Sequence, residues 1–126
     1  MKRLIASFII IVLIFGYNVF SERYVLSYCE ELNSRLEECG DNIKEENYSQ
    51  AKNNISNLLV SWQKRYTFLS VLIGDEALLE PQKIIVSIYY SISDESYDTC
   101  IQDIRECQGY IREIYFNTRT NLGNVM

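Results

Sequence analysis

The sequence predicts an all-α protein, in which an N-terminal transmembrane helix leads into a small up-down four-helix domain made of two hairpins. Three observations predict this fold: an uncharged apolar run opens the chain, apolar residues then recur at helical spacing, and Gly or Pro separates the segments. The 126 residues suffice for one domain beside the anchor.

The first twenty residues have the composition of a membrane span. Lys2 and Arg3 precede an uncharged run from Leu4 to Phe20, which as a helix would rise about 25 Å, near the lower limit for crossing a bilayer. A cleaved signal peptide would need a small-residue cleavage site, which "YNVFSERY" does not offer. A lipoprotein signal would need its cysteine close to the run, and Cys29 lies well beyond it.

We therefore expect residues 1–20 to be retained as a single-pass anchor and residues 21–126 to form the domain. The positive-inside rule places the basic N-terminus in the cytoplasm and the domain outside it, in the extracytoplasmic space of a cell membrane. Disulfides can persist in that compartment.

The first helix after the anchor has an apolar seam with spacings of 4, 3, 4 and 3 residues, and Gly40 is expected to end it. The seam consists of Val25, Cys29, Leu32, Leu36 and Cys39.

A second helix is expected from about Asn47 to Gly74, with a stripe of apolar residues at helical spacing. If it pairs with the first helix as an antiparallel hairpin, its end returns to the membrane surface. Its apolar residues there are expected to lie at the bilayer interface or against a partner. These interface candidates are Trp62, Phe68, Leu69, Val71, Leu72 and Ile73.

Pro81 suits the first turn of a third helix, "PQKIIVSIYYSI", although the β-branched residues would also suit a strand. A fourth helix is expected from about Asp94. Its seam has spacings of 3, 4, 3, 4 and 3 residues and consists of Tyr97, Cys100, Ile104, Cys107, Ile111 and Ile114.

Two segments of the chain resemble each other. "ENYSQAKNNISNLL" aligns without gaps on "ESYDTCIQDIRECQ", which places Tyr48 on Tyr97 and Leu58 on Cys107. The alignment indicates two hairpins of similar construction, although amphipathic helices also resemble one another without being repeats.

Charge and composition exclude several classes of function. The net charge of −5 argues against nucleic acid as a partner. The absence of histidine removes His-dependent catalytic triads, Cys–His dyads and His-containing metal sites. We predict no catalytic, cofactor-binding or metal-binding residues, and we read the acidic pairs as solvated helix faces.

The four cysteines lie on the two seams, and their spacings fit neither a zinc site nor a CxxC motif. Cys100 and Cys107 are about 10 Å apart along one helix, which is too far for a disulfide. In an up-down bundle the first and last helices are antiparallel, which leaves Cys29–Cys107 and Cys39–Cys100 as the predicted bridges. One bridge with two free thiols is the next possibility, and four free thiols buried as small apolar residues are the other alternative.

The segments "YSQAKNNISNLLVSWQK", "FLSVLIGDEAL" and "NLGNVM", placed after a short basic start and one membrane helix, resemble the bacterial family known as domain of unknown function 4363. Trp62, the turn from Leu72 to Leu78, and Asn124 with Val125 carry this resemblance. It implies a membrane-anchored helical architecture without an assigned reaction. It also implies a membrane partner, a YetF-like integral membrane protein encoded beside some members.

We therefore expect a non-enzymatic interaction or accessory module for a membrane partner, in an unknown oligomeric state. An envelope or spore structural protein is one alternative. A thiol-redox protein that uses Cys100 or Cys107 is another.

Overall fold

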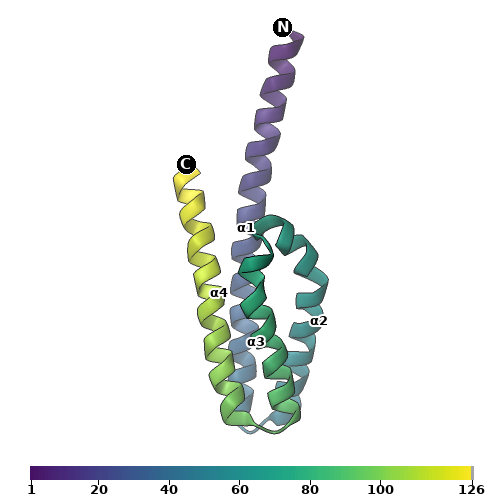
Figure 1. The fold of residues 1–126 in the computed structure, drawn as a ribbon, viewed down its shortest axis with the longest axis vertical. Coiled ribbons are helices and arrows are strands. Elements are labelled where there is room, and N and C mark those ends of the chain that lie inside the picture. Colours follow the sequence, from purple (N-terminus) through teal and green to yellow (C-terminus); the bar gives the residue numbers. More distant parts are fainter. Residues whose placement is uncertain (126) are drawn as a thin grey trace.

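The structure is a computed structural model that describes residues 1–125, and it describes side chains through Arg119. Four helices alternate in direction, and Figure 1 shows them as an up-down bundle from which the N-terminal part of the first helix projects. The all-α prediction is confirmed. The helices are α1 (Lys2–Lys44), α2 (Tyr48–Ile73), α3 (Asp75–Ser93) and α4 (Tyr97–Val125).

The two ends of the bundle differ. The upper end, as drawn in Figure 1, contains the α2–α3 turn, and both α1 and the end of α4 extend beyond this turn. The lower end contains the α1–α2 and α3–α4 loops. Both α1 and α3 pack against α2 and α4, so α1 and α3 occupy opposite corners of the bundle.

α1 is one uninterrupted helix of 43 residues. The prediction that Gly40 ends it is wrong, because the buried seam continues four residues past Cys39 to Ile43, which is 4% exposed. A Cβ atom at Gly40 would meet Ile104 Cγ2 at 3.9 Å, so residue 40 lies inside the helix against α4. Packing of the next turn thus outweighs the weak helix propensity of glycine.

A single residue, Gly74, connects α2 and α3. Its φ of 90° and ψ of 155° form a conformation that is essentially restricted to glycine. α3 begins at once, with Asp75 and Glu76 in its first turn, where carboxylates interact favourably with the helix dipole.

The expected position of Pro81 in a first turn is therefore wrong, because it lies within α3. Its ring is buried in the core, which offsets the backbone hydrogen bond that proline cannot donate. The segment that begins at Pro81 is helical, so the helix prediction for it is confirmed over the strand alternative.

The two hairpins are built alike, at an offset of 49 residues. Both lower loops contain a glutamate with positive φ, 63° at Glu46 and 59° at Glu95. The N–H group of each donates to an isoleucine carbonyl three residues earlier, at 3.1 Å. Buried residues recur at the same offset: Cys29 and Leu78, Leu32 and Pro81, Leu36 and Ile85, Cys39 and Ile88, Ile43 and Ile92, Ala51 and Cys100, Ile55 and Ile104, Leu58 and Cys107, Trp62 and Ile111, Leu69 and Thr118.

Candidate functional site

Among the residues whose side chains the structure describes, the most exposed apolar surface is the N-terminal part of α1. Leu4 is 75% exposed, Val12 is 51% exposed and Phe20 is 60% exposed. α1 is long and apolar enough there to cross a membrane, and none of this apolar window is buried by the rest of the protein. Lower down, the same helix contributes seven buried residues between Val25 and Ile43 to the core.

The end of α2 carries a second, smaller apolar surface beside the base of this span. Phe68 is 41% exposed and Val71 is 70% exposed. The Phe68 ring meets the Tyr24 ring edge to face, with centroids 4.9 Å apart. Leu72 and Ile73 are half-buried and border a small depression whose α1 wall includes Asn18 and Ser21.

Of the six predicted interface residues, Trp62 and Leu69 belong to the core, with 2% and 3% of their surface exposed. Their prediction as interface residues is wrong, since both point into the bundle while Phe68 and Val71 point outward. Helical spacing explains this division: Trp62 and Leu69 are seven residues apart and therefore share one face, which continues the stripe of Ile55 and Leu58.

Arg65 of α2 joins this region to α1, a contact that was not predicted from the sequence. Its guanidinium carbon lies 4.6 Å from the centre of the Tyr28 ring, and Nη1 lies 3.7 Å from a Glu31 carboxylate oxygen. Glu31 also pairs with Arg35 at 3.0 Å. The spacing of Tyr24, Tyr28 and Glu31 along one face of α1 was the available signal. Burial is the main cause that raises the pKa of the Tyr28 hydroxyl.

The four cysteines are free and buried, so the two predicted disulfides are wrong. Gln108 of α4 donates to Glu37 of α1 at 2.8 Å, which places Cys107 at the level of residue 38 rather than Cys29. Cys29 instead borders a depression together with Ile111 and Tyr115.

Cys39 donates to the carbonyl oxygen of Ala51, at 3.6 Å. Cys39 lies close enough to Cys100 that the charge of its ionised form would help to raise the pKa of Cys100. The two cysteines are nevertheless not bonded to each other. The predicted bridges needed the backbone to yield at a helix end near Gly40. Because α1 continues to Lys44, the unequal spacings of ten and seven residues cannot be reconciled.

Burial makes all four thiols poor nucleophiles. It raises the pKa of Cys29, Cys100 and Cys107 to about 12, and that of Cys39 to about 11. Nearby acidic side chains, among them Glu38 beside Cys39 and Glu106 beside Cys107, raise these pKa values further. A reactive thiol needs the opposite environment, in which the pKa is lowered by cations or a helix N-terminus.

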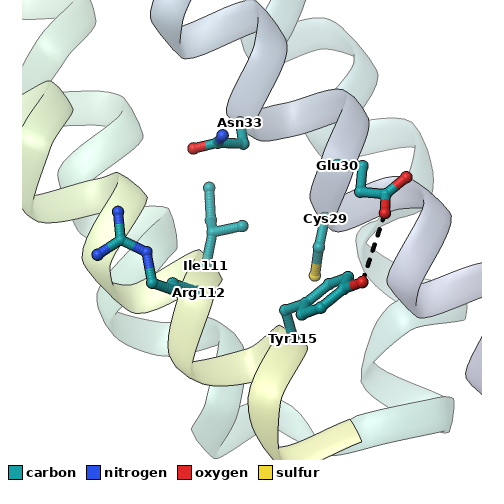
Figure 2. Close-up of a pocket in the computed structure, with 6 residues that line it drawn as sticks. All are labelled: Cys29, Glu30, Asn33, Ile111, Arg112 and Tyr115. Carbon is teal, nitrogen blue, oxygen red and sulfur yellow. Dashed lines mark hydrogen bonds between the residues drawn. The ribbon is translucent and has the colours of Figure 1, made fainter. Parts of the chain in front are cut away.

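Figure 2 shows the depression between α1 and α4, in which the Cys29 sulfur faces the Tyr115 ring. The Tyr115 hydroxyl donates to a Glu30 carboxylate oxygen at 3.5 Å, and Asn33 and Arg112 complete the lining. Its volume of about 180 Å³ is below the roughly 300–1,000 Å³ of small-molecule sites. Within the described residues, no three His, Cys, Asp or Glu side chains converge so as to hold a metal ion.

A family model, described as a domain of unknown function (DUF4363), matches residues 19–125. Searches of the curated proteins and of the solved structures gave no significant match. The family match begins near the end of the apolar run and includes all of the bundle. The chain therefore belongs to the DUF4363 family.

Proposed function

We propose that the protein is a single-pass membrane protein whose helical bundle acts outside the cytoplasm as a non-enzymatic accessory module for an integral membrane partner. The bundle, on this proposal, presents protein surfaces to that partner and carries out no reaction itself. The resemblance to relatives encoded beside a YetF-like protein makes such a protein the first partner to test.

The observation that carries this proposal is the continuity of α1. One helix of 43 residues, about 65 Å long, exposes apolar residues at its N-terminal end and forms the core at its other end. It has no loop between the two parts. A bundle joined to its anchor in this way keeps a fixed height and rotation relative to the bilayer, which suits a module that must meet a membrane protein.

The orientation follows from charge. Lys2 and Arg3 are the only charged residues before Glu22, and basic residues flanking a span stay in the cytoplasm. The bundle would then lie outside. The raised pKa values of the buried thiols favour this proposal over thiol-redox chemistry at Cys100 or Cys107.

The test is affinity purification of the full-length chain from native membranes, with the tag at the C-terminus. One variant carries a short flexible Gly-Ser insertion after Phe20, between the apolar run and the core. A matched control carries the same insertion in the lower loop, between Glu46 and Asn47.

We expect an integral membrane protein to co-purify in a constant ratio with the wild type and with the loop variant, and to be lost from the variant with the insertion after Phe20. Wild-type preparations without any such protein would contradict the proposal. Equal recovery from both insertion variants would contradict the role of rigid coupling.

A further inference from the structure

The upper end of the bundle lies level with the base of the apolar span. Tyr24 contacts Phe68 there, and the last turn of α2 borders a depression that it shares with Asn18 and Ser21, within and just after the apolar run. Figure 1 shows the α2–α3 turn beside α1 at the point where α1 leaves the bundle. If residues 4–20 span a bilayer, this turn reaches its surface.

Exposed apolar side chains mark this level. Val71 is 70% exposed, the highest value for a large apolar side chain among the described residues after Phe20. Phe68 is 41% exposed on the same helix, and Phe20 is 60% exposed on α1. Phe68 and Val71 thus add exposed apolar surface on α2 beside the base of the span, where Phe68 contacts Tyr24.

The charges of the domain divide between the two halves of the bundle. The lower half, residues 36–56 and 85–109, carries ten acidic and three basic residues, a formal charge of −7. The upper half, which comprises residues 21–35, 57–84 and 110–125, carries seven of each and is neutral. Its cations, among them Arg23, Lys64 and Arg119, offset the acidic Asp75 and Glu76 of the turn. The excess negative charge thus lies at the end remote from the span.

We propose that the upper end of the bundle docks on the lipid bilayer that holds α1, with Phe68 and Val71 at the level of the headgroups and the acidic lower half held away from anionic lipid. This inference rests on the anchoring that the proposed function includes. Such a contact would restrict tilting of the bundle about its anchor and would orient its remaining surfaces for a partner.

Lipid fits this surface better than a second protein does. Stable protein interfaces bury roughly 800 Å² on each partner, which is far more than two or three side chains at the tip of a bundle supply. A membrane contact needs only a few apolar groups at interfacial depth, because the anchor already holds the protein at the bilayer. The charge division is compatible with this contact, because the neutral half faces the bilayer and the acidic half lies away from it.

The test uses the full-length chain in proteoliposomes, with one nitroxide label on an added cysteine. The native thiols are buried, so the unsubstituted chain gives the background of labelling at native cysteines. The label is placed at Val71→Cys, at Val12→Cys within the span as a positive control, and at Tyr90→Cys near the lower end, where the native residue is 62% exposed. Collision of the label with oxygen, which concentrates in lipid, and with a water-soluble nickel chelate is then measured.

In vesicles of phosphatidylcholine and phosphatidylglycerol, we expect the label at residue 71 to lose collisions with nickel relative to the label at residue 90. Equal collision with nickel at residues 71 and 90, while the label at residue 12 lies in lipid, would overturn the docking and leave the anchor intact. Spin–spin broadening at residue 71 that grows with protein density would also overturn it, because a second copy would then cover the surface. Collision of nickel with the label at residue 12 would show that the apolar run does not span the bilayer, and would contradict the anchor itself.

Discussion

Tyr48 and Tyr97 stack face to face, with ring centroids 3.8 Å apart and ring planes 10° from parallel. Each is the first residue of its helix, α2 or α4, and each follows a loop with the same hydrogen bonds and one glutamate of positive φ. The contact therefore joins corresponding positions of the two hairpins across the lower end of the bundle. The two residues also align in the sequence resemblance.

The stack predicts an energetic coupling between the hairpins. In a double-mutant cycle with Tyr48→Ala and Tyr97→Ala, we expect a coupling of about 0.5–1.5 kcal/mol, typical of aromatic pairs. Urea unfolding in detergent measures it. Tyr48→Phe keeps the ring and should keep the coupling, whereas additive effects of the two alanines would show that the stack contributes nothing.

The buried thiols predict that the fold is lost in alkali. Burial raises the pKa of the cysteines from 9.0 to about 11 or 12, so below pH 9.0 they are protonated in both the folded and unfolded states. Above that pH the unfolded chain loses thiol protons that the folded chain keeps. The free energy of unfolding should then fall by up to about 1.4 kcal/mol per thiol for each pH unit.

Urea unfolding between pH 7 and pH 11 measures this slope. Cys100→Ala removes one titrating group and should flatten the alkaline slope, whatever its effect at pH 7. Stability that stays constant to pH 11 would be incompatible with thiols held neutral by burial.

Trp62 and Phe68 lie six residues apart on α2 and should respond differently to truncation. Trp62 is 2% exposed, and Trp62→Ala should destabilise the bundle by about 3–5 kcal/mol through the cavity it leaves. Phe68→Ala should cost about 1 kcal/mol, chiefly its ring contact with Tyr24. Thermal unfolding of the two variants in the same detergent compares them, and equal losses would place Trp62 outside the core.

Two glycines should respond to alanine in opposite directions. Gly74 has a φ of 90°, so Gly74→Ala should cost about 1–3 kcal/mol. Gly109 lies within α4, where an added Cβ atom would meet nothing within 4 Å, so Gly109→Ala should stabilise by roughly 0.8–1 kcal/mol. Chemical unfolding tests the pair, and a stabilising alanine at residue 74 would mean that the α2–α3 turn has another conformation.

Periodicity predicted which residues form the helices, because buried seams such as Leu36–Cys39 and Ile104–Cys107 recur every three or four residues. It predicted boundaries less well. Gly40 was expected to end the first helix, yet the burial of Ile43 shows that the next turn is still part of it. Pro81 was expected in the first turn of the third helix, yet the one-residue turn at Gly74 lets α3 begin at Asp75. Both outcomes depend on packing between helices, which a local pattern does not contain.

The candidate surface was only partly predictable for the same reason. The string from Phe68 to Ile73 indicated an apolar end of α2, but not which of its side chains point outward. That division follows from the direction of the core, which buries Leu69 and leaves Val71 exposed. The disulfide prediction failed because it depended on the relative register of α1 and α4, and the contact between Gln108 and Glu37 fixes a different register.

The central claim is that α1 anchors the bundle outside the cytoplasm, and labelling of intact cells with a membrane-impermeant maleimide tests it most directly. Tyr90→Cys lies near the lower end at a position that is 62% exposed, whereas the native thiols are buried. We expect this cysteine to be labelled in intact cells, and a cysteine inserted between Met1 and Lys2, which leaves both basic residues in place, to be labelled only after permeabilisation. Labelling of the inserted cysteine in intact cells together with protection of Tyr90→Cys would contradict the claim.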